Sequence, residues 1–357
     1  RAALLQSLTE AVALVRAGIG GSVTVVGEAG IGKSRLVTEA RALSHASTAG
    51  EPGLEAGDGV LNKAPRWVEG RWLSYAEGTA YAGWQVLLRQ LLELTDDCTR
   101  EGCEALEDRI AALCPEQTNA IYPYVARLLA LPVDEATATQ LDSLVEAGLL
   151  QSATFRAVAD LLTCAALEAP LVLVLQDVHW ADETSLALLD HLMALTESVP
   201  LLLLVVMRPD RDHGGWRIYE TVARDYAHRH TDVPLTPLTS DDSEMLARQL
   251  LAAGGTEFSA SLVDGIIDRA EGNPFFTAEI VRSLLDQPVT GDQPSPEALP
   301  LTVRDMLMAR IDRLPVAARQ VLQLAAVVGR SFQYRVLADI VAGEVLASAG
   351  RALEDAL

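Results

Sequence analysis

Apolar residues follow two different periods along this chain of 357 residues. They recur at helical spacing between residues 4 and 15, and again over 182–195, where Asp182 is the expected N-cap. Continuous apolar runs of strand length stand at 171–176 and 201–207. Uninterrupted runs of this kind are typical of strands that are buried on both faces of a parallel sheet.

Weaker forms of the same patterns predict the remaining elements. Short strands are expected at 22–27, 66–73 and 231–236, and helices at 33–43, 240–255 and 278–286. Residues 84–168 have mostly helical patterns, with breaks expected near Pro115, Pro123 and Pro132. Because strands alternate with helices, the sequence predicts an α/β fold, with helices on both faces of a parallel sheet.

Changes in composition indicate the domain boundaries. The α/β pattern fills residues 1–236, and a purely helical domain is expected over 237–290. Residues 46–65 hold four glycines and two prolines without periodicity, which predicts a mobile surface loop. Four prolines within 287–300 indicate a linker, and the helical spacing that follows begins a third domain over 300–357. The chain starts with Arg and stops within a helical pattern, so we expect it to be an excerpt of a longer protein.

The charge balance argues against one class of partner. The formal net charge is −21, and such an acidic surface repels phosphate backbones, so direct binding of nucleic acid is not expected. No apolar run reaches the length of a membrane span, so we expect a cytoplasmic protein without membrane contact.

The four cysteines are Cys98, Cys103, Cys114 and Cys164. None form a C-x-x-C pair and none lie beside a pair of histidines, so neither a zinc site nor a disulfide framework is expected. Reduced, partly buried thiols are the prediction for a cytoplasmic protein.

The clearest chemical signal is the stretch GEAGIGKS, which matches G-x-x-x-x-G-K-[ST] between a predicted strand and a predicted helix. In this phosphate-binding loop, backbone N–H groups and a helix N-terminus surround the anion. Lys33 would reach the β and γ phosphates, and Ser34 would offer its hydroxyl to Mg²⁺. The residues expected to contact the nucleotide are Gly27, Glu28, Ala29, Gly30, Ile31, Gly32, Lys33, Ser34 and Arg35.

Gln176 and Asp177 end the apolar run 171–176, where ligands bind in parallel sheets. Nucleotide-hydrolysing sites usually present two acids here. If Asp177 holds Mg²⁺ together with Ser34, no adjacent acid remains to orient the attacking water. If Gln176 takes the metal-facing position instead, its neutral amide is a poor ligand for this hard ion. In both alternatives, a single carboxylate is left to bind the metal and to orient the attacking water, two tasks that two acids usually share.

Arg208 follows the neighbouring apolar run and is predicted to sense the γ-phosphate from the same sheet edge. A surface ion pair is the alternative for this residue. His179 is a candidate polar contact, although it and Trp180 would also suit packing at the edge of the sheet. The predicted catalytic group is therefore Lys33, Gln176, Asp177 and Arg208.

The order of several motifs resembles one family. GEAGIGKSRL, VLVLQDVHWADETSLALL, LLLLVVMRPD, EGNPFFTAEIVRSLL and LPLTVRDMLMARIDRLPVAARQVLQLAAVVGRSF look like the signal-transduction ATPases with numerous domains, the STAND branch of the AAA-related P-loop proteins. The resemblance covers nearly the whole chain except 46–65. It implies a P-loop domain, an all-α lid and a winged-helix domain, here cut short, that close on ATP or ADP with Mg²⁺.

The resemblance also assigns further roles. Pro274, in the GNP motif, would lie against the nucleotide base. RWVEGRWLSYAEGTAY and RPDRDHGGWR look most like modules linked to bacterial class III adenylyl or guanylyl cyclases, and large LuxR-type regulators share the core. The chain departs from the family at Gln176, where an acid is usual, and at Met207. The first departure puts efficient hydrolysis in doubt and leaves binding intact.

Three hypotheses follow. The first is a slow nucleotide switch that controls an effector domain in the same polypeptide. The second is an ATPase activated by assembly into a homo-oligomer. The third is a scaffold with a vestigial loop, against which the intact Lys33 and Ser34 argue.

Overall fold

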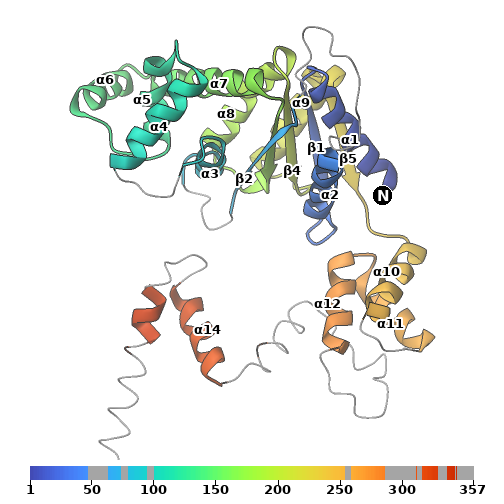
Figure 1. Cartoon of the computed structure of the whole chain (residues 1–357). Coiled ribbons are helices and arrows are strands. Elements are labelled where there is room, and N and C mark those ends of the chain that lie inside the picture. Colours follow the sequence, from blue (N-terminus) through green and yellow to red (C-terminus); the bar gives the residue numbers. More distant parts are fainter. Residues whose placement is uncertain are drawn as a thin grey trace, which may run out of the picture. The chain divides into compact units, whose positions relative to one another are not determined.

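A computed structural model of the chain describes residues 1–46, 63–73, 79–94, 100–253, 259–285, 311, 316–328, 336–341 and 343. The fold divides into two compact units, Arg1–Thr236 and Pro237–Leu357. Figure 1 labels their helices and strands.

The first unit is built on a five-stranded parallel sheet in the order β2-β3-β4-β1-β5. Its strands are β1 (Gly21–Gly27), β2 (Arg66–Arg71), β3 (Leu171–Gln176), β4 (Leu201–Met207) and β5 (His230–Leu235). All five strands lie where the apolar patterns predict them. The α/β fold class is therefore confirmed for this unit.

Alternate residues of each central strand enter two different cores, which is why the apolar runs are continuous. In β3, Leu171, Leu173 and Leu175 join one core, while Val172 and Val174 join the other. The second core is covered by α1 (Ala2–Arg16) and α2 (Lys33–Ala46). Burial on both faces makes every residue of β3 and β4 inaccessible to solvent.

The first core is covered by the helices between β2 and β5. They are α3 (Ala82–Leu91), α4 (Arg100–Leu113), α5 (Thr118–Leu128), α7 (Leu150–Glu168), α8 (Glu183–Met193) and α9 (Gly214–Asp225). A further helix, α6 (Glu135–Glu146), contacts α5 and α7. Asp182 caps α8 as predicted, because its carboxylate accepts a hydrogen bond from the Ser185 backbone N–H at 3.0 Å.

The predicted helix break at Pro123 is wrong, whereas breaks do occur near Pro115 and Pro132. Pro123 lies inside α5 and is buried there. Its ring removes the hydrogen bond to the Asn119 carbonyl, one turn earlier. Burial of the apolar face around Pro123, which includes Ile121 and Val125, offsets this loss.

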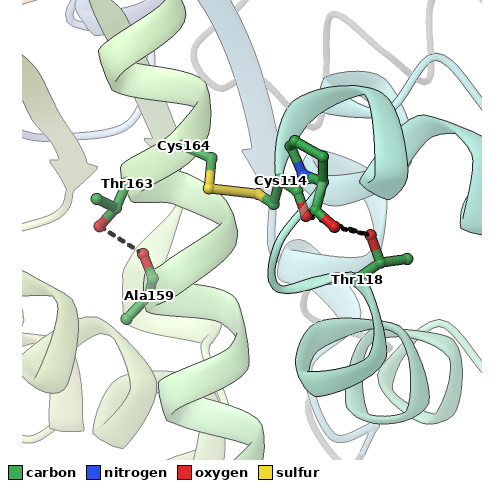
Figure 2. The surroundings of a disulfide bond; sticks show 6 residues. Cys114, Thr118, Ala159, Thr163 and Cys164 are labelled. Atoms are coloured by element: carbon green, nitrogen blue, oxygen red, sulfur yellow. Dashed lines mark hydrogen bonds between the residues drawn. A yellow bond between two sulfur atoms is a disulfide. The ribbon is translucent and has the colours of Figure 1, made fainter.

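The expectation of reduced thiols is wrong for two of the four cysteines. Cys114 and Cys164 form a disulfide (Figure 2), and their Cα atoms are 5.8 Å apart. Cys114 follows α4, and Cys164 lies in α7 next to Thr163, whose hydroxyl donates to the Ala159 carbonyl at 2.8 Å. The bond therefore ties the α4–α5 connection to the helix that leads into β3.

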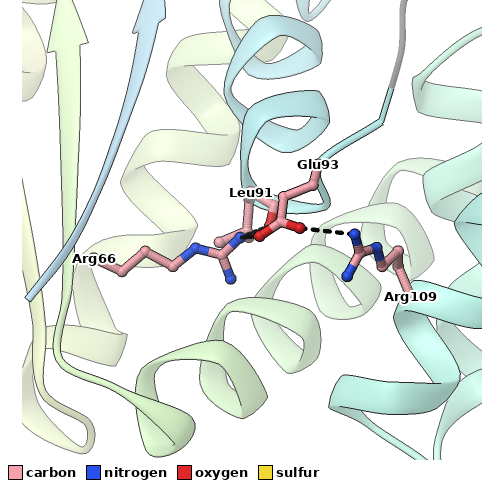
Figure 3. A network of polar contacts seen from close by, with 4 residues as sticks. All are labelled: Arg66, Leu91, Glu93 and Arg109. Carbon is pink, nitrogen blue, oxygen red and sulfur yellow. Dashed lines mark hydrogen bonds and ion pairs between the residues drawn. The ribbon is translucent and has the colours of Figure 1, made fainter. Parts of the chain in front are cut away.

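A second tie joins β2 to the same helices. Figure 3 shows the carboxylate of Glu93 between the guanidinium groups of Arg66 and Arg109. Its oxygens lie 3.4 Å from Arg66 Nη2 and 2.7 Å from Arg109 Nη2. Arg66 also donates to the carbonyl of Leu91 at the end of α3. This network fixes the start of β2 against α3 and α4.

The described part of the second unit begins with three helices that share one core, α10 (Ser240–Ala253), α11 (Ala260–Ala270) and α12 (Pro274–Leu285). A further helix, α14, spans Val316–Val328. The predicted linker at 287–300 lies outside the described residues, as does most of the predicted loop at 46–65. The same holds for most of the winged-helix domain predicted over 300–357.

Loss of the disulfide should destabilise the first unit. Its closed loop of 50 residues limits the unfolded chain, so Cys164→Ser should lower the free energy of unfolding by about 4 kcal/mol. Guanidinium chloride unfolding measures this loss, with Cys103→Ser as the control outside the bond. Thiol titration of the denatured, unreduced protein should find two of the four cysteines, and four reactive thiols would contradict the pairing.

Candidate functional site

The glycine-rich loop Gly27–Ser34 connects the end of β1 to the start of α2. Gly30 and Gly32 have φ angles of 76° and 103°, a region that side chains with a Cβ rarely adopt. The turn that these two residues make carries the chain directly into α2. The N-terminal end of α2 therefore faces the concave side of the loop, with its first N–H groups and positive dipole end available to an anion.

Lys33 holds the loop in its curled form. Its ammonium donates to the carbonyls of Gly27 at 2.7 Å and Glu28 at 2.9 Å. Burial lowers the pKa of Lys33, an effect that Asp177 opposes and Arg208 reinforces. Asp177 and Arg208 follow two other strands, β3 and β4, and the charges of both act on Lys33.

Ser34 and Gln176 are in contact. The Ser34 hydroxyl donates to the Gln176 side-chain oxygen at 3.3 Å, and the Gln176 side chain is only 3% exposed. Gln176 is the last residue of β3 and lies level with Val206 of the central strand β4. Of the two arrangements left open by the sequence, the geometry matches the one in which the glutamine faces Ser34.

Asp177 turns out of the strand. Its φ of 58° is left-handed, which is unusual for a residue other than glycine and is found at functional sites. Its carboxylate lies 3.7 Å from Nε of Arg71, the last residue of β2. Asp177 also raises the pKa values of Lys33 and His179, so its negative charge belongs to the same cluster.

Arg208 follows β4 directly and its side chain is exposed. It lowers the pKa values of both Lys33 and His179. The structure thus brings Lys33, Asp177 and Arg208 together at the carboxyl ends of three neighbouring strands. The sequence predicts this location at one edge of the sheet for all three residues. Arg35, by contrast, pairs with Glu39 along its own helix at 2.9 Å.

Pro274 lies in the second unit, where it opens α12. The Asn273 side chain accepts a hydrogen bond from the Phe275 N–H at 3.1 Å, and Gly272 before it is left-handed. These contacts make the GNP motif a tight connection between two helices. The contact of Pro274 with a nucleotide base stays a prediction.

His179 lies in the 3₁₀ turn Val178–Trp180 and is only 4% exposed. Its ring is 5.0 Å from the Trp180 ring and stacks on His213 at 6.5 Å between ring centroids. Neither ring nitrogen has a hydrogen-bond partner among the described residues. Burial lowers the pKa of His179 to about 4, although Asp177 acts in the opposite direction. The imidazole is therefore neutral at physiological pH.

Two arginines of the site were missed from the sequence. Arg71 pairs with Asp177, and its position at a strand's carboxyl end could have identified it. Arg1 donates to the Ile31 carbonyl in the glycine-rich loop at 2.5 Å and to the Thr236 carbonyl at 3.2 Å. No local motif in the sequence marks that contact.

The donor set around Ser34 does not fit a metal ion held by the protein. Mg²⁺ prefers carboxylate and phosphate oxygens in octahedral geometry. Here the partner of the Ser34 hydroxyl is a neutral amide, and the neighbouring carboxylate of Asp177 lies beside Arg71. Within the described ranges, no group of three or more His, Cys, Asp or Glu side chains could hold a metal ion.

Comparison with known families gives two matches. A family model described as AAA ATPase domain matches residues 1–206, and a domain of unknown function (DUF8739) matches residues 239–290. An uncharacterized protein of Rhizobium meliloti (strain 1021) is 26% identical over 326 residues, which make up 88% of this chain and 28% of that protein. The chain therefore spans less than a third of the length of this relative.

The chain also has low similarity to two solved structures. One is Drosophila ORC bound to DNA, with 14% identity and a TM-score of 0.41 over 99% of this chain and 77% of that one. The other is a Walker-type ATPase of Pyrococcus abyssi, with 13% identity and a TM-score of 0.41 over 95% and 87%. The first unit has the fold of a P-loop NTPase. In the described ranges, none of the helices has the length and apolar character needed to cross a bilayer.

The neutral His179 should make stability fall in mild acid. The unfolded imidazole takes up a proton near pH 6.5, whereas the folded one does so only near pH 4. Protonation therefore favours unfolding as the pH falls from 6.5 to 4, by at most about 1.4 kcal/mol per pH unit. Urea unfolding across this range should show a smaller loss for His179→Gln than for wild type. The exposed His45→Gln is the control, and equal slopes for all three proteins would contradict the assignment.

Proposed function

The chain belongs to the AAA ATPase domain family, and on this basis we propose that it is a regulatory switch that binds ATP and ADP and hydrolyses ATP slowly. An AAA ATPase domain implies nucleotide binding. The observation that carries the slow rate is the buried Gln176 against Ser34, in the position of the first of two acids.

The proposed binding site uses the loop Gly27–Ser34. Its backbone N–H groups and the first turn of α2 would hold the phosphates. Lys33 would exchange its bonds to two loop carbonyls for bonds to phosphate oxygens. Arg208, whose charge acts on Lys33, would contact the γ-phosphate.

Slow hydrolysis follows from the single carboxylate. A general base must reach the proton that it removes, either directly or through one water. Asp177 would have to do this alone, with one oxygen of its carboxylate 3.7 Å from Arg71 Nε. A second acid beside it would share this work, and Gln176 cannot accept a proton at physiological pH.

The proposed switch couples the site to the rest of the protein. We assign residues 1–236 to the nucleotide domain, 237–290 to the lid and 300–357 to a winged-helix domain. The family match at 239–290 supports a separate module in the lid region. The nucleotide would close the lid through Pro274 and release it after hydrolysis. A homo-oligomer that supplies an arginine in trans is the alternative route to faster turnover.

The effector is proposed to lie in the same polypeptide. The Rhizobium relative is much longer than the matched region, which covers 28% of it. The resemblance of two motifs to cyclase-linked modules favours a class III adenylyl or guanylyl cyclase domain. A LuxR-type transcription regulator is the alternative, and the sequence of the full-length protein would distinguish the two.

Single-turnover hydrolysis tests the switch. Wild type should cleave pre-bound ATP well below about 1 per second, the lower end of ordinary enzyme turnover. Gln176→Glu should speed this step by about tenfold or more, since a positioned acid or base typically contributes about 10²- to 10⁴-fold. Ordinary turnover by wild type, with no gain in the variant, would reject the switch.

Lys33→Ala should abolish nucleotide binding because it removes the ammonium at the centre of the loop. The chain offers a matched control in Lys63, its other lysine, which is exposed. Lys63→Ala should bind as wild type does. Circular dichroism establishes that both variants are folded. Equal ATP affinity of Lys33→Ala and Lys63→Ala would show that the loop is not the binding site.

A further inference from the structure

We propose that this site binds the bare polyphosphate of its nucleotide as well as the magnesium complex, and that Gln176 is the residue that removes the metal requirement. This inference rests on the proposed function, because it concerns how the same site recognises its ligand. The ligand would be a nucleoside triphosphate or diphosphate without a bound metal ion.

The first observation is the contact between Ser34 and Gln176. The hydroxyl expected to bind the metal donates to the amide oxygen at 3.3 Å, so each group already has a partner. The Gln176 side chain is 3% exposed at the end of a strand that is buried along its whole length. Its position is therefore set by the sheet, and it meets the ligand as a neutral group.

The second observation is the position of the remaining carboxylate. Asp177 has left-handed backbone geometry and its Oδ2 lies 3.7 Å from Arg71 Nε. Arg71 stands opposite Gln176 in the sheet, so the guanidinium lies beside the very end of β3. The guanidinium of Arg71 therefore competes with a cation for the same carboxylate oxygen.

Electrostatics then favours a bare anion. A carboxylate next to a polyphosphate repels it unless a divalent cation bridges the two. An amide at the same place does not repel the polyphosphate, so a bridging cation adds little to the affinity of the site. Burial lowers the pKa of His179, and the charges of Arg208 and Lys33 act in the same direction, whereas Asp177 opposes them. The positive charges of Lys33 and Arg208 therefore lie in one region, where they would offset the charge of a phosphate. The protein thus supplies positive charge that a metal ion would otherwise bring.

Nucleotide affinity with and without magnesium tests this inference. ATP and ADP are titrated into the 357-residue chain by calorimetry, once with excess MgCl₂ and once with EDTA. The Kd of wild type should change by less than about threefold between the two conditions. Gln176→Glu should bind about tenfold or more weakly in EDTA, and Mg²⁺ should restore the affinity.

Gln140→Glu is the matched control, since it adds the same charge at an exposed position of α6. It should behave as wild type in both conditions. A loss of about tenfold or more for wild type in EDTA would overturn the inference while leaving the proposed function intact. If Asp177→Asn removed that loss, Asp177 would be the metal ligand instead.

The outcomes separate the two proposals. Binding by wild type in neither condition would overturn the proposed function, and with it this inference. Thermal unfolding establishes whether Gln176→Glu is folded. Should the variant fail to fold, the comparison of wild type in MgCl₂ and EDTA decides the matter alone.

Discussion

The alignment of parallel strands at one edge of the sheet is the constraint on which the whole site depends. Strands β3, β4 and β1 are neighbours, and each delivers one polar group beyond its last apolar residue. The two apolar cores and the backbone hydrogen bonds between the strands hold these strands in place. Because the strands are rigid, a loop lysine and two strand-end charges meet although they are up to 175 positions apart in the sequence.

The sequence predicts this sheet well because strands that are buried on both faces give continuous runs of apolar residues. A run such as LVLVLQ permits no alternation, and its polar end must point at the edge where ligands bind. The glycine-rich loop was equally clear, because it must follow such a strand and precede a helix. The five strands and the glycine-rich loop therefore lie where the sequence predicts them.

Features that depend on tertiary distance were not visible. Cys114 and Cys164 are 50 residues apart, and only the packing of α7 on the α4–α5 connection brings their Cα atoms within disulfide range. Proline disfavours a helix interior for local reasons, so the sequence predicts a break at Pro123. The burial that offsets this cost depends on the tertiary packing of α5, which no local pattern shows. No sequence motif joins Arg71 to its partner Asp177, because Arg71 ends β2 and Asp177 follows β3.

The exchange of one acid for an amide has consequences of two kinds, because a carboxylate beside a phosphate has two roles. It can take part in proton transfer, and it can hold a cation against the phosphate. An amide of nearly the same shape keeps the packing at the end of β3 and the contact with Ser34. It loses the charge that both roles require. On the function and the inference proposed above, the amide at Gln176 would both slow cleavage and relax the need for metal, and the two effects together would favour retention of the nucleotide.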